Sequence, residues 1–390
     1  MYRADRLQQA AGAIFAEIAG RKRQLIADGH ELIDLSIGSP DLPPAPHIID
    51  ALSHEVANPA NYGYTLQASE NFRQAVAQWY AQRFAVQLDP DREVMGLLGS
   101  QEGLANICFA LLNPGDLVLV PDPAYPIYQA GPILAGAQVY PLPLTAENNF
   151  QPRLDLIPDP IAEKAKLMIL NFPANPVAAT VSLDFFQEVV AFARKHRILV
   201  LHDAAYSELA FDGYRPPSFL QVPGAKEVGV EFNSLSKTYN LAGCRIGYAM
   251  GNPEVLAALA EMKGHTDYGP FNPLQKAAVA ALTGPQDYVR ATIATYQHRR
   301  DLLVSGLNTI GWSVPSPRAT MFLWAKIPSG YNDREFSFQL MEQAGVIVVP
   351  GSAFGRHGQG YVRIALVQPA EILEQTIQKI AQSGILKAVS

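Results

Sequence analysis

A lysine, Lys237, stands just beyond a predicted strand, among residues that bind anions. Residues 228–233 alternate between apolar and other side chains, which predicts a strand with one buried face. Ser234 and Ser236 lie within three residues of Lys237, and Arg245 follows eight residues after it. Hydroxyls and a guanidinium bind phosphate, and a lysine amine can attack a carbonyl. The set suits a lysine Schiff base beside a phosphate, although an exposed lysine in a polar loop would explain the same residues.

A second predicted strand carries an acidic group to its end. Residues 197–203 form a hydrophobic run that ends in Asp203, and Tyr206 follows three residues later. A carboxylate at the end of a buried parallel strand is costly unless it is paired, so we expect a cationic partner for Asp203. His202 alternates to the opposite face of the strand, and we interpret it as a structural histidine.

Two further segments carry groups that bind anions. Arg363 lies between apolar residues on a predicted strand, where a guanidinium is costly without an anion, so a binding role is favoured over a solvated surface. Residues 99–103 open a helix whose apolar residues recur at helical spacing, and its N-terminus offers free backbone N–H groups to an anion. The glycine and serine at this helix start are weak support alone, because many helices begin in this way.

Length and composition narrow the class of protein. A chain of 390 residues fits two domains, and 48% hydrophobic with 17% charged residues excludes disorder. A net charge of -6 gives no reason to expect nucleic acid or an anionic membrane as a partner. Cys108 and Cys244 form neither a disulfide framework nor a metal set, which favours a reducing compartment. With no secretory signal and no membrane helix visible, we predict a cytoplasmic protein without a metal.

The elements that must position these residues alternate between strands and helices. This order predicts an α/β architecture with a mostly parallel sheet, in which functional groups gather where the strand ends converge. Beyond about residue 285, a long polar helix and a strand-rich end predict a second, smaller domain. We expect an N-terminal arm with part of the small domain (1–45), a large domain (46–285) and a C-terminal small domain (286–390).

Residues 234–247 resemble the lysine segment of the class I/II aminotransferases, enzymes that depend on pyridoxal 5′-phosphate (PLP). The resemblance extends over roughly residues 10–385 and implies a fold of type I among PLP-dependent transferases. In that fold, helices flank a mostly parallel central sheet, and a smaller α+β domain is built from both chain ends. The implied reaction moves an α-amino group from an amino acid to a 2-oxo acid by a ping-pong mechanism. Six residues stand in the family's order: Asn175, Asp203, Tyr206, Lys237, Arg245 and Arg363.

The resemblance implies catalytic roles for Lys237, Asp203 and Tyr206, and a cofactor contact for Asn175. Lys237 would hold the cofactor covalently and then act as the base that moves the substrate's α-proton. Asp203 would keep the nitrogen of the cofactor ring protonated, and that nitrogen would be the cationic partner expected for its carboxylate. Tyr206 and Asn175 would bind the phenolic oxygen O3′ of the ring.

The remaining implied contacts concern the phosphate, the ring face and the substrate. Tyr125, between two prolines, would stack on the ring, although a packed aromatic residue in a turn would look the same. Arg363, with Asn175 and the backbone near Gly38, would bind the substrate α-carboxylate, but a plain turn also explains Gly38 and the prolines after it. The residues implied at the phosphate end of the cofactor are Ser100, Gln101, Ser234, Ser236 and Arg245.

Residues 61–80 are similar to the family's tyrosine loop and the helix after it. In the family this tyrosine reaches the partner's phosphate, so the resemblance implies a homodimer with shared sites. Here the loop is one residue shorter, and we choose Tyr64 rather than Tyr62. Tyr268 and Asn272 are candidates for contacts to the substrate side chain from the neighbouring subunit.

Within the family, residues 35–44, 79–84 and 99–103 look most like the LL-diaminopimelate aminotransferase branch, which implies LL-diaminopimelate and 2-oxoglutarate as substrates. Gln101, however, stands where that branch often has lysine. Val177 and two alanines replace the usual Thr-Gly, which we interpret as a change of loop shape that leaves Asn175 in place. Aspartate, alanine, methionine and aromatic substrates remain alternatives, as does a PLP β-lyase. A PLP-binding regulator is disfavoured, because no basic DNA-binding extension is visible.

Overall fold

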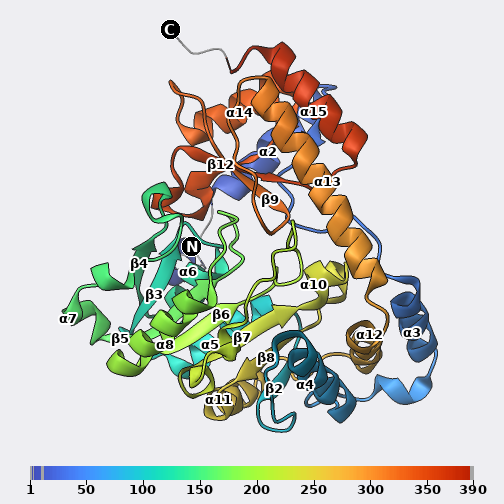
Figure 1. Ribbon diagram of the computed structural model, residues 1–390, viewed down its shortest axis with the longest axis vertical. Helices are drawn as coiled ribbons and strands as arrows, with labels where there is room; N and C mark the ends of the chain where they lie inside the picture. The colour runs from blue at the N-terminus through green and yellow to red at the C-terminus, as the bar shows by residue number, and fades with distance from the viewer. Residues whose placement is uncertain (1, 3, 10–12, 387–390) are drawn as a thin grey trace.

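The computed structural model describes residue 2, residues 4–9 and residues 13–386, and its largest sheet has seven strands. Their order is β2-β8-β7-β6-β5-β3-β4 (Figure 1). Four neighbouring pairs are parallel, and β8 alone runs antiparallel to both of its neighbours. The predicted α/β fold with a mostly parallel sheet is confirmed. The strands are β2 (Val94–Leu97), β3 (Leu117–Asp122), β4 (Gln138–Pro143), β5 (Ala165–Asn171), β6 (Leu199–Asp203), β7 (Gly229–Ser234) and β8 (Gly247–Gly251).

Helices cover both faces of this sheet. Along β5, Met168 and Leu170 pack into one hydrophobic core, and Leu167 and Ile169 pack into another. Strands buried on both faces read as continuous apolar runs, which explains the sequence of residues 167–170. Helices α4 and α8 cover the first face, and α5, α6 and α11 cover the second (Figure 1). The helices around the sheet are α3 (Pro46–Val56), α4 (Glu70–Phe84), α5 (Ser100–Leu111), α6 (Ile127–Leu134), α7 (Asp159–Ala162), α8 (Leu183–His196), α9 (Ala225–Val228), α10 (Leu235–Thr238), α11 (Pro253–Gly264) and α12 (Asn272–Thr283).

The small domain draws on both ends of the chain. Strand β1 (Ile33–Asp34) pairs in parallel with β10 (Val346–Ile347), so the N-terminal part lies against the C-terminal part. An antiparallel sheet forms beside them from β9 (Phe322–Lys326), β11 (Val349–Pro350) and β12 (Tyr361–Ala365). The long helix α13 (Asp287–Thr309) extends from near α12 to α15 (Ala370–Ser383), and α14 (Asp333–Ala344) lies beside them (Figure 1). The boundaries at residues 45 and 285 stay predictions.

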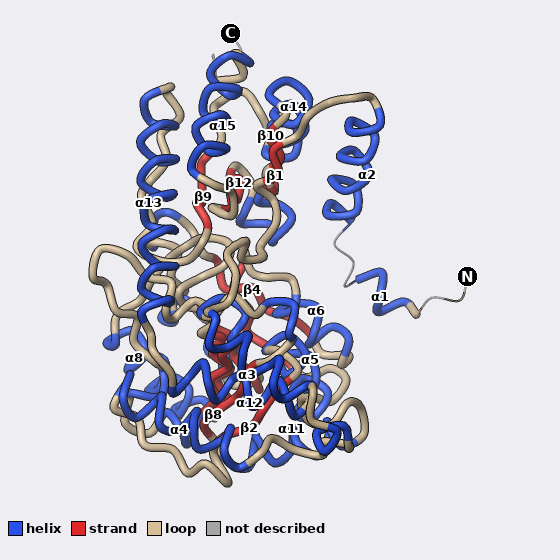
Figure 2. Tube along the Cα trace, turned by 90° about the vertical axis from the view of Figure 1, so that its right-hand side faces the viewer, coloured by secondary structure: helices blue, strands red, loops and turns tan. Residues whose placement is uncertain are grey.

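The predicted N-terminal helix from residue 5 to about 29 consists of two helices. They are α1 (Asp5–Gln9) and α2 (Ala13–Ala27), and residues 10–12 between them lie outside the described residues. Helix α1 packs against α6, and α2 lies against α14 beside the small domain (Figure 2). Among the described residues, no helix combines the length and the apolar character that crossing a bilayer requires.

Candidate active site

The ends of the parallel strands face the small domain across a cavity of about 370 Å³. Strands β6 and β7, the loop after β5, the start of α5 and strand β12 all contribute side chains to its lining. Ligand sites in open α/β sheets lie at this edge, outside the carboxyl ends of the strands. All the site residues predicted to act within one subunit line this cavity: Gly38, Ser100, Gln101, Tyr125, Asn175, Asp203, Tyr206, Ser234, Ser236, Lys237, Arg245 and Arg363.

Lys237 lies on the short helix α10, directly after β7. Ser234 caps this helix, and its hydroxyl accepts a hydrogen bond from the Ser236 N–H at 3.1 Å. The Lys237 ammonium donates to the Gly38 carbonyl oxygen at 2.5 Å, which joins the large domain to the segment after β1. Burial, together with the charges of Arg363 and Arg245, lowers the pKa of Lys237 to about 8. The amine is therefore much easier to deprotonate than an exposed lysine.

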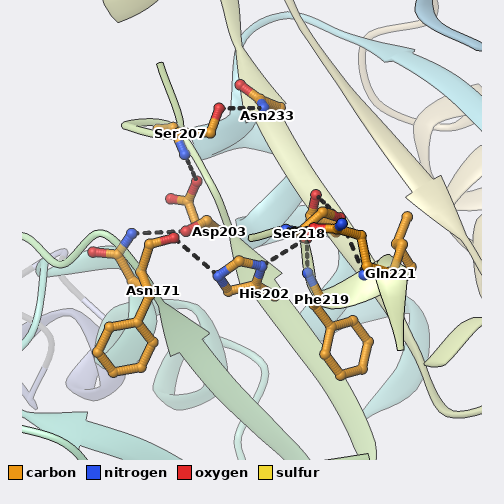
Figure 3. A network of polar contacts seen from close by, with 12 residues as sticks. Asn171, His202, Asp203, Ser207, Ser218, Phe219, Gln221 and Asn233 are labelled. Carbon is orange, nitrogen blue, oxygen red and sulfur yellow. Dashed lines mark hydrogen bonds and ion pairs between the residues drawn. The ribbon is translucent and has the colours of Figure 1, made fainter. Parts of the chain in front are cut away.

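Asp203 ends strand β6 in a buried position. The Tyr128 hydroxyl donates to its Oδ2 at 2.7 Å, and the Ala205 N–H donates to its Oδ1 at 3.2 Å. Burial raises the pKa of the Asp203 carboxyl above its usual range, so a cationic group in the cavity would stabilise its ionised form. Asn171 donates to the Asp203 carbonyl oxygen at 2.8 Å and holds the ends of β5 and β6 together (Figure 3).

Sequence reasoning missed Tyr128, although a signal for it was present. Tyr128 lies three residues after Tyr125, at the start of α6, and both tyrosines line the cavity. The Tyr125 hydroxyl donates to Oε1 of Gln101 at 2.8 Å.

The sequence also did not predict two phenylalanines in the cavity lining, Phe15 on α2 and Phe354 in the small domain. Their rings contact each other edge to face, with centroids 5.8 Å apart.

Arg363 brings a guanidinium into the cavity from β12. Its Nη1 donates to Oδ1 of Asn175 at 3.0 Å, and its Nη2 donates to the Ser36 carbonyl oxygen at 2.8 Å. Its Nε is buried and has no hydrogen-bond partner among the described residues. The guanidinium lies over the rings of Phe322 and Phe354, and burial lowers the pKa of Arg363 to about 10. The Arg363 guanidinium therefore has an N–H donor free for a planar anion such as a carboxylate.

Tyr206 lies beside this group. Its hydroxyl accepts a long hydrogen bond from Nδ2 of Asn175 at 3.5 Å, and its ring meets Phe322 edge to face at 5.8 Å. The loop of Val177 and Ala178 leaves Asn175 in the cavity lining, as the interpretation of its altered sequence expects.

The start of α5 and the Arg245 guanidinium lie close together in the lining of the cavity. Gly99 precedes the helix with φ of +81°, and a Cβ there would lie 2.5 Å from Nη2 of Arg245. Only glycine therefore lets the guanidinium approach the free backbone N–H groups of the first turn. Ser234 and Ser236 line the same cavity. This donor set fits a phosphate, with the Lys237 amine and the Asp203 carboxylate left for the rest of a cofactor.

The three residues predicted to serve a neighbouring subunit do not line this cavity. Tyr64 is 90% exposed, and its ring lies 6.0 Å from that of Tyr268. Asn272 donates to Oδ1 of Asn61 at 2.7 Å. Within one chain, the structure therefore does not bring these side chains to the other site residues.

His202 lies on the opposite face of β6 from Asp203 and does not line the cavity. Its Nδ1 lies 2.8 Å from Oε2 of Glu231, and its Nε2 lies 3.1 Å from the Phe172 carbonyl oxygen (Figure 3). Glu231 also accepts from the Tyr80 hydroxyl at 2.7 Å. The fully buried histidine thus links β5, β6 and β7 behind the site.

Comparisons with known proteins agree with this geometry. A family model of class I and II aminotransferases matches residues 30–380, and the chain belongs to this family. The LL-diaminopimelate aminotransferase of Moorella thermoacetica is 48% identical over 97% of this chain and 98% of its own. That of Desulforudis audaxviator is 49% identical over 97% of this chain and 96% of its own.

Solved structures are similar over nearly the whole chain. Substrate-bound BacF from Bacillus subtilis has a TM-score of 0.92 at 36% identity and covers 96% of both chains. A probable N-succinyldiaminopimelate aminotransferase from Thermus thermophilus has a TM-score of 0.90 at 40% identity, over 95% of this chain and 100% of that one. The protein is a PLP-dependent aminotransferase, and the predicted family, enzyme class and cofactor are confirmed.

The lowered pKa of Lys237 predicts how cofactor uptake depends on pH. The neutral amine is the form that attacks the cofactor carbonyl, and its pKa lies near 8 instead of at the ordinary 10.5. We expect the rate of covalent PLP uptake by cofactor-free protein to rise between about pH 7 and 9 and then to level off. Stopped-flow absorbance measures this rate, and N-acetyl-lysine amide measured in parallel accounts for titration of the cofactor itself. A rate that rises only above about pH 10 would contradict the assignment.

Proposed function

We propose that this aminotransferase moves an amino group from LL-diaminopimelate to 2-oxoglutarate in amino acid biosynthesis. The names of relatives that are 48% and 49% identical over almost their full length support this substrate. The geometry of Arg363 is the observation that supports an amino acid as the substrate. The buried Nε of Arg363 has no hydrogen-bond partner among the described residues. A substrate carboxylate would supply that partner.

The proposed roles follow from where each group lies. When bound, PLP supplies a carbonyl that takes up the amino group and a ring that draws electrons from the neighbouring carbon. Lys237, whose amine has a lowered pKa, would take the proton from the substrate α-carbon and deliver it to the cofactor carbon that carries the carbonyl. Asp203 holds a proton on the ring nitrogen, and the hydroxyl of Tyr128 fixes the orientation of its carboxylate. Asn175 and Tyr206 bind the ring oxygen O3′.

The other residues orient the two molecules. Tyr125 covers one face of the ring, and Arg363 with Asn175 and Gly38 holds the substrate α-carboxylate. These three groups, from β12, the loop after β5 and the segment after β1, would fix the angle at which the α-carbon meets the base. The proposed phosphate contacts come from residues at the start of α5 and around α10: Ser100, Gln101, Ser234, Ser236 and Arg245.

The proposed enzyme is a homodimer in which Tyr64 binds the phosphate of the partner's site. Tyr62, Tyr64 and Leu66 are exposed large side chains on one short segment, and the ring of the exposed Tyr268 lies 6.0 Å from that of Tyr64. Exposed apolar residues that gather in one area mark surfaces for association. In this dimer, Tyr268 and Asn272 would reach the substrate side chain of the other subunit. The location in the cytoplasm stays a prediction.

The substrate proposal is tested by the visible spectrum of the purified holoenzyme. Amino acids are added one at a time without a 2-oxo acid, and conversion of the cofactor to its amino form is recorded. We expect LL-diaminopimelate to convert it at the lowest half-saturating concentration, with meso-diaminopimelate as the stereochemical control. Conversion by aspartate, alanine, methionine or phenylalanine but not by LL-diaminopimelate would contradict the proposal. Ammonia released without a 2-oxo acid would instead indicate a β-lyase.

A further inference from the structure

A buried lysine outside the cavity holds two carboxylates from different segments. Lys263 lies at the end of α11, and its side chain is only 3% exposed. Its Nζ donates to Oε1 of Glu102 and to Oδ1 of Asp267, each at 2.6 Å. An ammonium out of water is stable only with such partners, so the positions of all three groups depend on one another.

Glu102 connects this lysine to the phosphate end of the proposed cofactor site. It stands in the first turn of α5, directly after Ser100 and Gln101, which line the cavity. Its Oε1 also accepts from the Leu98 N–H at 2.8 Å, so the carboxylate fixes the turn that enters the helix. Burial raises the pKa of the Glu102 carboxyl above its usual range. Without a cation beside it, this carboxylate would place a negative charge next to a site that must attract phosphate.

Asp267 connects the same lysine to the loop of Tyr64. Two residues further on, the Gly269 N–H donates to the Thr65 carbonyl oxygen at 2.7 Å. A Cβ on Gly269 would lie 2.9 Å from that oxygen, so the two segments are in close contact. The ring of Tyr268 lies against that of Tyr64. The segment that Lys263 fixes through Asp267 thus supports the tyrosine loop directly.

We propose that Lys263 is a positioning residue for the cofactor phosphate. Through Glu102 it orients the start of α5 and cancels the nearby negative charge in its own subunit. Through Asp267 it holds the loop from which Tyr64 extends. This second part rests on the proposed function, in which Tyr64 serves the site of the partner. One buried ammonium then supports both phosphate sites of the dimer.

The test is the dissociation constant of PLP, measured by spectral titration of cofactor-free protein. Lys263→Met replaces the ammonium by an apolar side chain one atom shorter and leaves Glu102 without a cation beside it. We expect the dissociation constant to rise about tenfold or more, which corresponds to about 1.4 kcal/mol. Adding Glu102→Gln should recover the larger part of this loss, because the uncompensated charge beside the site is gone, while Asp267 still lacks its partner. Lys226→Met is the matched control, since Lys226 pairs with Glu93 at 2.8 Å and lines no part of the cavity.

The PLP dissociation constant of folded protein separates this role from a merely structural one. If Lys263 only stabilised the fold, Lys263→Met would lower the melting temperature and leave the PLP affinity of the folded protein unchanged. Lys263→Met that binds PLP as tightly as the wild type, or a loss that Glu102→Gln leaves unchanged, would overturn the proposal. If Lys263→Met alone does not fold, the double variant is compared with Glu102→Gln, in which Lys263 still holds Asp267, and equal PLP affinities of the two would overturn the role of Asp267.

Tyr64→Phe distinguishes this inference from the proposed dimer site. If Lys263 acts on PLP binding through the Tyr64 loop, the two substitutions should not act independently. The fold-increase in the PLP dissociation constant of the Lys263→Met, Tyr64→Phe double variant should then be smaller than the product of the two single fold-increases. Independent losses would overturn the role of Asp267. If Tyr64→Phe alone binds PLP like the wild type, the proposed role of Tyr64 fails, whereas rescue by Glu102→Gln would still support the role of Lys263 at its own site.

Discussion

Lys237→Ala is expected to abolish transamination, with kcat lowered by at least about 10⁴-fold. The structure offers no second base in its place, because Lys237 is the only lysine among the described residues that line the cavity. Neighbouring hydroxyls such as that of Tyr206, whose pKa burial raises further, cannot take a carbon-bound proton at neutral pH. The measurement is a single-turnover assay of 2-oxo acid formation with saturating amino acid.

The same variant should still bind PLP, but without a covalent link. The phosphate end of the site, with Arg245 and the start of α5, is untouched by the substitution. We therefore expect dialysis to remove the cofactor from Lys237→Ala and not from Lys226→Ala, which serves as the control. A variant that keeps more than about a hundredth of wild-type kcat would contradict the role of Lys237 as the base.

Arg363→Met is expected to lower kcat/KM by about a thousandfold, or about 4 kcal/mol, while the melting temperature stays equal or rises. The loss follows because a substrate carboxylate would lose its charged donor in a buried site. The gain in stability follows because Arg363 pairs with no carboxylate among the described residues, and burial already lowers its pKa to about 10. Replacing an uncompensated buried charge by an apolar side chain removes that cost.

A matched control comes from another buried arginine. Arg299 donates to both carboxylate oxygens of Asp41 at 2.8 Å and lies outside the cavity. Arg299→Met should lower the melting temperature, because it leaves a carboxylate unpaired. Steady-state kinetics and thermal unfolding of both variants decide the matter. Arg363→Met that melts lower than Arg299→Met, with kcat/KM near the wild type, would show that Arg363 is structural.

The sequence predicted the fold because its signals were local. Hydrophobic runs such as residues 167–170 mark strands buried on both faces, and Asp203 and Lys237 follow such runs directly. Polar residues at the ends of parallel strands must meet at one edge of the sheet, so their common location followed from the order of elements. The resemblance to a family added the roles, which no local pattern could supply.

The groups that the sequence did not predict depend on contacts between distant residues. Tyr128 bonds to Asp203 across 75 positions, and Lys263 meets Glu102 across 161. Lysine is usually exposed, so the residue type of Lys263 did not indicate a buried ion pair. The spacing of Lys263 from Leu256 and Leu259 did indicate burial, because all three lie on the buried side of α11. Tyr64 could be placed by resemblance alone, since one chain does not contain the site that it would serve.

The pairing of β1 with β10 bears on how the protein matures during synthesis. The segment after β1 contains Gly38, whose carbonyl oxygen accepts a hydrogen bond from the Lys237 ammonium. Strand β1 itself pairs with residues 346 and 347, which are made much later in synthesis. A chain emerging from the ribosome folds its N-terminal parts first. In this protein, that order leaves the segment after β1 without the pairing to β10 until most of the chain has been made. We therefore expect capture of the cofactor to be a late event, once the chain has been made at least as far as residue 347.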